Sequence, residues 1–227
     1  MEESYLPFAL KYSNYTKFTQ QTVKEFTPLE ELCVYSIDSG KNRMHSRMTL
    51  NLCYYTYFFK MVETILRHNK DFTPDFMAGK SKMPPIDLTV LKFLNNPPVQ
   101  KYLGVRKSHY LPFNSTFFND FGPGDLFVDM KPYITRLLDD GVKGVIAVGA
   151  LDFLTNYAMS EKVTSDLKWK WQKEYNADSR DDCKYGLCKE YKNLWEIRVA
   201  GSGHGTSFYK PVMALEIITR LVNWKPE

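Results

Sequence analysis

The sequence lacks the two signals that would assign it to a membrane or to nucleic acid. Its most apolar stretch, residues 50–66, contains Asn51, Lys60 and Glu63 and falls short of the ~20 apolar residues that a bilayer-spanning helix needs. The 30 basic and 26 acidic residues give a net charge of +4, and the basic ones form no run of five or six. We therefore expect no membrane span and no nucleic-acid partner.

The chain also lacks the residue spacing of a metal site. It has four cysteines and four histidines, the cysteine spacing is not Cys-x-x-Cys, and no histidine lies within seven residues of a cysteine in the sequence. We expect neither a metal nor another cofactor.

The four cysteines, Cys33, Cys53, Cys183 and Cys188, allow three complete pairings. Cys183 and Cys188 flank a Lys-Tyr-Gly-Leu segment in which Gly186 permits a tight turn, so we favour this pair as a small disulfide-closed loop.

Two triplets of the glycosylation pattern, at residues 14–16 and 114–116, agree with an oxidising secretory compartment, although residues 1–9 show no signal-peptide pattern. We predict the secretory pathway, with the lysosome or vacuole or the extracellular space as destination.

Hydrophobic residues make up 44% of the sequence, enough to bury a substantial core, and we treat residues 1–227 as a single domain. In the weakly patterned first third we predict a strand at residues 32–37 and a helix at 47–66. A helical cap region is expected over residues 41–83, and it ends in the glycine- and proline-rich segment 78–85.

The second half of the chain has clearer periodicity. A helix ending at Gly141 precedes a nearly continuous apolar run, and a later stretch alternates apolar and polar residues. Residues 168–193 are charged, aromatic and irregular, and we expect a surface excursion there. The predicted elements are a helix at 130–140, a strand at 142–148, a helix at 153–168, a strand at 194–200 and a helix at 212–224. This order is typical of the end of a doubly wound α/β sheet.

Two chemically active residue types follow the two predicted strands. Asp152 lies three residues after Gly149, and His204 lies in a glycine-flanked loop after the second strand. Functional groups of open parallel sheets lie beyond the carboxyl ends of the strands. With Ser4 near the start, the chain order is serine, aspartate, histidine, which is the order of α/β-hydrolases. Each residue alone also has an ordinary structural interpretation, as a terminal serine, a helix cap and a structural histidine.

Three separated segments resemble the serine carboxypeptidase family. Residues 124–157 (GDLFVDMKPYITRLLDDGVKGVIAVGALDFLTNY) look like the helix and strand that precede the family's catalytic aspartate. Residues 93–105 (FLNNPPVQKYLGV) and 199–222 (VAGSGHGTSFYKPVMALEIITRLV) are similar to an upstream helix and to the histidine loop with the last helix. The resemblance covers residues 84–224 and implies the C-terminal portion of an α/β-hydrolase fold, truncated at the N-terminal side, with a helical cap insertion.

The resemblance also implies roles for individual residues. Asp152 would be the triad aspartate, His204 the general base and Ser4 the nucleophile. Glu3, when protonated, would bind the terminal carboxylate of the substrate, and Tyr5 would lend its backbone N–H to the oxyanion hole.

Several positions depart from the family pattern. Glu2 stands where the nucleophile turn has glycine, and Leu6 where it has a small residue. Ala150 replaces an aspartate, Thr155 stands where some members have cysteine, and residues 205–207 replace Met-Val-Pro after the histidine.

The resemblance therefore predicts a serine-type carboxypeptidase, as a fragment or divergent member, that acts on peptide or protein C-termini. The alternatives are a catalytically inactive binding protein with the same fold and an acyltransferase with the same triad. A separate N-terminal chain is an expected partner, because the family's first strands and the glycine-rich half of its oxyanion hole would precede Glu3.

Overall fold

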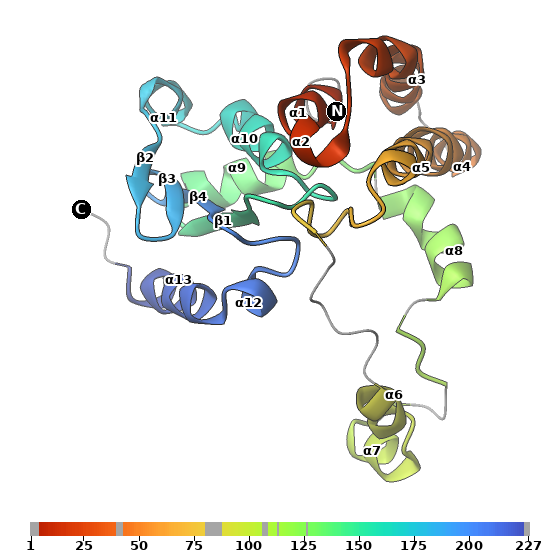
Figure 1. The fold of residues 1–227 in the computed structure, drawn as a ribbon. Helices are drawn as coiled ribbons and strands as arrows, with labels where there is room; N and C mark the ends of the chain where they lie inside the picture. Colours follow the sequence, from red (N-terminus) through yellow and green to blue (C-terminus); the bar gives the residue numbers. More distant parts are fainter. Residues whose placement is uncertain are drawn as a thin grey trace.

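A computed structural model describes residues 5–39, 43–79, 88–105, 109–112, 114–125 and 127–224. A sheet with helices on both faces forms the C-terminal part, the N-terminal helices pack beside it, and α6 with α7 forms an arm that projects from the body (Figure 1). The helices are α1 (Tyr5–Lys11), α2 (Ser13–Thr16), α3 (Gln20–Ser39), α4 (Arg43–Leu50), the π-helix η1 (Asn51–Phe58), α5 (Phe59–His68), α6 (Leu88–Leu94), α7 (Pro97–Tyr102), α8 (Ser115–Asp125), α9 (Lys131–Asp139), α10 (Tyr157–Asp166), α11 (Gln172–Ala177), α12 (Thr206–Tyr209) and α13 (Pro211–Asn223). The strands are β1 (Gly144–Gly149), β2 (Asp181–Cys183), β3 (Gly186–Tyr191) and β4 (Leu194–Val199).

The sheet has the strand order β1-β4-β3-β2. The strands β1 and β4 are parallel, which confirms the two predicted strands as neighbours, and β3 and β2 follow antiparallel. Successive side chains of a strand point to opposite faces. Accordingly, Trp195, Ile197 and Val199 pack with Ile217 of α13 on one face, while α10 and α11 cover the other (Figure 1).

The prediction of an irregular excursion at residues 168–193 is wrong. This segment contains α11 and the β2–β3 hairpin, which widens the sheet. The hairpin turns at Gly186, whose φ of 138° favours glycine. An antiparallel edge hairpin accepts charged residues on its solvent side, so its sequence shows little of the apolar alternation that identifies a strand.

The predicted strand at residues 32–37 is also wrong, because these residues lie inside α3. The side chains of Phe26, Glu30 and Cys33 are buried at helical spacing, and Tyr35 is 71% exposed. A short apolar run does not distinguish a strand from a helix, and here packing of α3 against η1 selects the helix.

The predicted helix at residues 47–66 is confirmed as the continuous helical run of α4, η1 and α5. The assignment of residues 41–83 to a cap region, and of the whole chain to one domain, stays a prediction.

An aromatic cluster joins the N-terminal helices to the loop that follows β1. Tyr5 and Phe8 of α1 pack with Phe58, Phe72 and Phe153, all of them buried. The centroid of the Tyr5 ring lies 5.3 Å from that of Phe58 and 5.7 Å from that of Phe153. Aromatic side chains bury large apolar areas, so this cluster anchors α1 beside the sheet.

Both pairs of cysteines form disulfides. Cys183 is bonded to Cys188, as the sequence favours, and Cys33 of α3 is bonded to Cys53 of η1. None of the described helices combines the length and apolarity that crossing a membrane requires.

Candidate active site

The site is built where the two parallel strands end. Gly149 of β1 pairs with Val199 of β4, so the loops that follow both strands leave the sheet at the same edge. A Cβ atom on Gly149 would lie 2.2 Å from the carbonyl oxygen of Gly203, and one on Gly203 would lie 2.1 Å from that of Asp75. Glycine at both positions is what allows these backbones to touch.

The structure brings Asp152 and His204 into contact. His204 Nδ1 lies 3.0 Å from Asp152 Oδ2. Asp152 is 1% exposed, whereas the His204 side chain is 39% exposed. In the tautomer that donates from Nδ1 to the carboxylate, the lone pair lies on Nε2, where it can accept a proton. A buried acid that orients an accessible imidazole is the arrangement of a general base.

Thr155 is a third member of this arrangement that the sequence did not identify as a site residue. Its N–H donates to Asp152 Oδ1 at 3.1 Å and its hydroxyl donates to Asp152 Oδ2 at 2.7 Å. The Thr155 oxygen also lies 3.1 Å from His204 Nδ1, so it can share that N–H with the carboxylate. The Asp-x-x-Thr spacing of Asp152 and Thr155 could have indicated this contact, because an aspartate side chain often accepts a hydrogen bond from a backbone N–H a few residues later in the chain.

The segment 73–77 connects the loop that carries Asp152 to the loop that carries His204, and the sequence did not identify this role. The backbone N–H of His204 donates to the Asp75 carbonyl at 2.8 Å. The N–H groups of Phe153 and Leu154 donate to the Pro74 carbonyl at 2.9 Å. Only the tertiary contact reveals this role, because nothing in the sequence around Pro74 marks it as a neighbour of the histidine loop.

The comparison with known families decides the identity of the chain. The family model for serine carboxypeptidases matches residues 6–224. This chain belongs to the serine carboxypeptidase family. Serine carboxypeptidase 3 of Hordeum vulgare is 23% identical over 229 residues, which cover 98% of this chain and 44% of that protein. Carboxypeptidase Y of Saccharomyces cerevisiae is 28% identical over 169 residues, 69% of this chain and 31% of that protein.

A solved structure shows the same fold. Kex1(delta)p, a prohormone-processing carboxypeptidase from Saccharomyces cerevisiae, matches with a TM-score of 0.64 and 19% identity over 98% of this chain and 51% of that chain. The likeness confirms the predicted α/β-hydrolase fold class. The chain spans about half or less of the length of these serine carboxypeptidases.

Of the N-terminal residues that the family resemblance singles out, Glu3 and Ser4 lie outside the described residues. Tyr5 begins α1, and its hydroxyl donates to the Leu154 carbonyl at 2.7 Å. Burial and the nearby charge of Asp152 raise the pKa of Tyr5, so this hydroxyl keeps its proton and its hydrogen bond. The residue that follows Ser4 in the sequence is thus anchored on the loop that carries Asp152.

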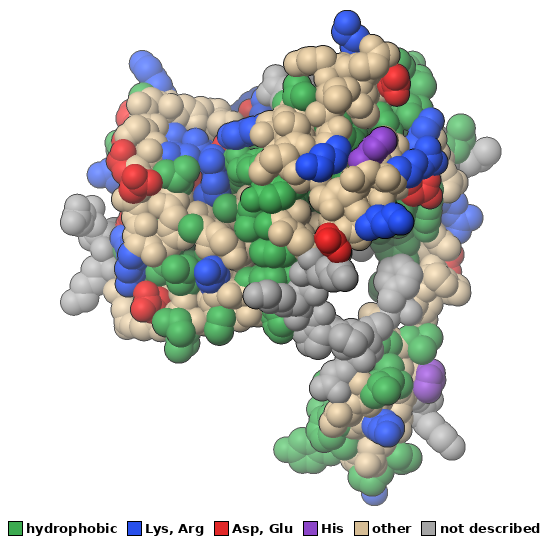
Figure 2. Space-filling view, viewed as in Figure 1, with side chains coloured by type: hydrophobic (Ala, Val, Ile, Leu, Met, Phe, Trp, Pro, Cys, Tyr) green, Lys and Arg blue, Asp and Glu red, His purple; other side chains and the backbone are tan. Residues whose placement is uncertain are grey.

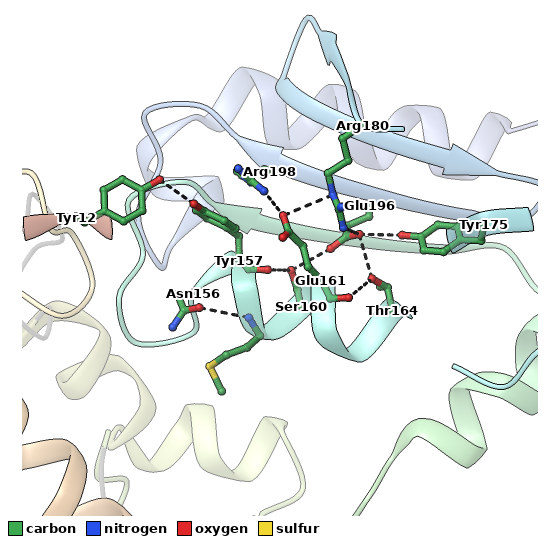
Figure 3. Close-up of polar contacts among 11 residues, drawn as sticks. Tyr12, Asn156, Tyr157, Ser160, Glu161, Thr164, Tyr175, Arg180, Glu196 and Arg198 are labelled. Carbon is green, nitrogen blue, oxygen red and sulfur yellow. Dashed lines mark hydrogen bonds and ion pairs between the residues drawn. The ribbon is translucent and has the colours of Figure 1, made fainter. Parts of the chain in front are cut away.

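Beneath the site, a polar network ties α10 to β4 (Figure 3). Arg198 of β4 pairs with Glu161 of α10, and its guanidinium lies 3.5 Å from the centroid of the Tyr157 ring. The Tyr157 hydroxyl in turn lies 3.0 Å from that of Tyr12. Since α10 follows the Asp152 loop and β4 leads to His204, these contacts limit relative movement of the two loops.

The centre of this network is a second buried carboxylate, Glu196 of β4, which is 4% exposed. Its Oε2 accepts from Tyr175 at 2.8 Å, from Thr164 at 3.0 Å and from Arg180 at 2.8 Å, and its Oε1 accepts from Ser160 at 3.2 Å. A buried charge that is paired and fully hydrogen-bonded is structural, because its lone pairs are already occupied.

Proposed function

We propose that this chain is a serine-type carboxypeptidase whose acid–base pair is Asp152 and His204. The observation that supports the proposal most directly is the 3.0 Å contact between a buried Asp152 carboxylate and an accessible His204 imidazole. Membership of the serine carboxypeptidase family supplies the reaction class.

In the proposed mechanism, Ser4 attacks the carbonyl carbon of the last peptide bond of the substrate, and His204 Nε2 takes the proton of the hydroxyl. His204 then gives this proton to the departing amino acid, leaving an acyl-enzyme that water hydrolyses with His204 again acting as base. Asp152 holds the imidazole in the required tautomer and stabilises its positive charge. The hydroxyl of Thr155 fixes the orientation of the Asp152 carboxylate through its 2.7 Å hydrogen bond.

We assign the remaining roles from the family resemblance. The backbone N–H of Tyr5 would stabilise the oxyanion, since an N–H in the first turn of a helix has no acceptor within that helix. Protonated Glu3 would bind the terminal carboxylate of the substrate, which favours acidic pH.

The partner and the compartment are part of the same proposal. Among the described strands, β1 pairs with β4 alone, so its other edge can accept a further strand from the same domain or from a separate N-terminal chain. The disulfides Cys33–Cys53 and Cys183–Cys188 support folding in the secretory pathway, with the lysosome or vacuole or the extracellular space as destination.

The test is release of C-terminal residues from a blocked peptide at about pH 5, combined with labelling by a serine-directed phosphonate whose attachment site is mapped by mass spectrometry. We expect labelling at Ser4, and a loss of turnover of about 10⁴-fold or more in His204→Ala. His68→Ala is the matched control, because His68 is exposed at the end of α5 and should leave turnover unchanged. Absence of release, or full activity in His204→Ala, would refute the proposal. Ester products with an alcohol acceptor, without peptide hydrolysis, would identify an acyltransferase instead.

A further inference from the structure

A hollow of about 500 Å³ lies on the α10 and α11 side of the sheet, and its lining includes none of the residues proposed for catalysis. Its lining residues are Ala158, Glu161, Lys162, Ser165, Tyr175, Asn176, Arg180 and Lys189. Figure 2 shows lysine and arginine side chains gathered between α10, α11 and the β2–β3 hairpin. This volume exceeds that of a small oxyanion, since a single water molecule takes ~30 Å³.

Lys189 of β3 is the unusual residue in this lining. It is 6% exposed, and its Nζ lies 4.3 Å from the centroid of the Tyr175 ring. Within the described part of the chain, no carboxylate lies within 4.0 Å of this ammonium. A buried ammonium normally has an anionic partner, because removing it from water without one is costly.

The carboxylate opposite Lys189 in the sheet is already engaged. Glu196 lies opposite Lys189 in the register of β4 and β3, but its Oε2 accepts hydrogen bonds from Tyr175 and Arg180. The cation–π contact with Tyr175 compensates the ammonium only in part, because the ring carries no net negative charge.

The other two cations of the lining are already paired with carboxylates. Lys162 is paired with Asp166 at 3.2 Å, and Arg180 is paired with Glu161 through Nε and with Glu196 through Nη2. Lys189 is therefore the lining cation that has no carboxylate of the described residues in direct contact. Burial, followed by the charge of Arg180, lowers the pKa of Lys189, and the charges of Asp178, Glu196 and Glu161 compensate this only in part.

We propose that this hollow is a binding site for a small oxyanion of the phosphate or sulfate type, with Lys189 as its buried cation. Such an anion would accept hydrogen bonds from the Lys189 ammonium and from the Arg180 guanidinium, which has five N–H donors in all. It would lie in direct contact with the Lys189 ammonium, where no carboxylate of the described residues lies within 4.0 Å. The site is separate from the Asp152–His204 pair, so its occupancy does not depend on the proposed peptidase activity.

The experiment measures binding of inorganic phosphate to the whole chain by isothermal titration calorimetry, against chloride at matched ionic strength. We expect Lys189→Gln to weaken phosphate binding about tenfold or more, because a hydrogen bond to a charged group is lost. The matched control is Lys24→Gln, which removes one positive charge from an exposed position on α3 and should change the affinity less than about twofold. The proposal is overturned if the wild-type protein shows no measurable phosphate binding. It is also overturned if the wild type, Lys189→Gln and Lys24→Gln bind phosphate equally, because that result would mark an adventitious ion only.

A second measurement needs no variant and decides the matter if Lys189→Gln does not fold. An amine-reactive reagent is applied to the wild-type protein with and without phosphate, and the modified lysines are quantified by mass spectrometry. Phosphate should slow modification of Lys189 severalfold and leave that of Lys24 unchanged. Equal rates at Lys189 with and without phosphate would overturn the proposal.

Discussion

The molecule buries two carboxylates in the same part of the sheet: Asp152 in the loop that follows β1, and Glu196 within the neighbouring strand β4. Their exposed fractions are similar, 1% and 4%. Glu196 accepts hydrogen bonds from side chains that keep their protons, among them the Arg180 guanidinium. Asp152 instead contacts the imidazole of His204, which is open to solvent. Burial of an acid therefore does not by itself identify a reactive centre.

The two carboxylates differ in the side chains that contact them. Arginine is not deprotonated in proteins, and burial, followed by the charge of Glu196, raises the pKa of Tyr175, so protons in the Glu196 network stay in place. Histidine exchanges a proton near neutral pH. The network around Glu196 stabilises the fold beneath the site, whereas the Asp152 pair can take part in chemistry.

The largest expected effect that separates the two carboxylates is on turnover. Asp152→Asn keeps the size of the side chain but no longer stabilises the imidazolium or the required tautomer of His204, and we expect kcat to fall by about 10⁴-fold. Asp181→Asn, at an exposed position of β2, should leave kcat unchanged. The measurement is steady-state hydrolysis of a blocked peptide. Equal kcat values for the two variants would remove the distinction between Asp152 and other carboxylates.

The next effect is on stability and belongs to Glu196. Glu196→Ala leaves the donors of Thr164, Tyr175 and Arg180 without their acceptor in a buried place, and we expect the free energy of unfolding to fall by about 3–5 kcal/mol. Glu190→Ala is the control, since Glu190 forms a half-exposed pair with Arg220 worth about 0–1 kcal/mol. Urea unfolding followed by circular dichroism measures both. A loss below 1 kcal/mol for Glu196→Ala would show that the network is dispensable.

A smaller effect tests whether Thr155 belongs to the reactive centre. Thr155→Val removes the hydroxyl that contacts Asp152 and His204, and we expect kcat/KM to fall about tenfold, equivalent to one hydrogen bond. Thr155→Ser keeps the hydroxyl and should stay within about threefold of wild type. The pH dependence of kcat/KM should shift in the valine variant and not in the serine variant, because only the former alters the surroundings of the imidazole. If serine and valine had the same effect, Thr155 would be a packing residue.

The smallest effect is on stability at alkaline pH. Burial, followed by the hydrogen bond with Tyr157, raises the pKa of Tyr12 from 10.0 to about 12. Above pH 10 the folded protein keeps a proton that the unfolded chain has lost, so the contribution is complete below pH 10 and is lost as pH rises towards 12. Urea unfolding at pH 9 and pH 11 should show a decrease that is smaller in Tyr12→Phe. An identical decrease in that variant would exclude Tyr12 as a source.

Much of the region around the site could be predicted from the sequence. The apolar run that becomes β1, the alternation that becomes β4 and the glycines around His204 are local patterns, and they place Asp152 and His204 at strand ends. The hairpin of β2 and β3 could not be predicted in this way, because its charged side chains carry no clear period.

The N-terminal region shows the opposite balance. Residues 32–37 have the composition of a strand, and packing against η1 makes them part of α3. The disulfide between Cys33 and Cys53 spans 20 residues and could not be chosen among the three pairings, whereas the one between Cys183 and Cys188 closes a tight turn and could be favoured.

The sequence by itself determined the residue types at the strand ends, the short disulfide loop and the family, because these depend on neighbours within a few positions. The tertiary structure alone decided that Asp152 meets an imidazole while Glu196 meets a guanidinium. It also decided that Thr155 and the segment 73–77 support the pair, and that the buried Lys189 ammonium has no carboxylate of the described residues within 4.0 Å. The physical reason is that each of these contacts joins side chains or backbone groups brought together by strand register and helix packing, which no local pattern encodes.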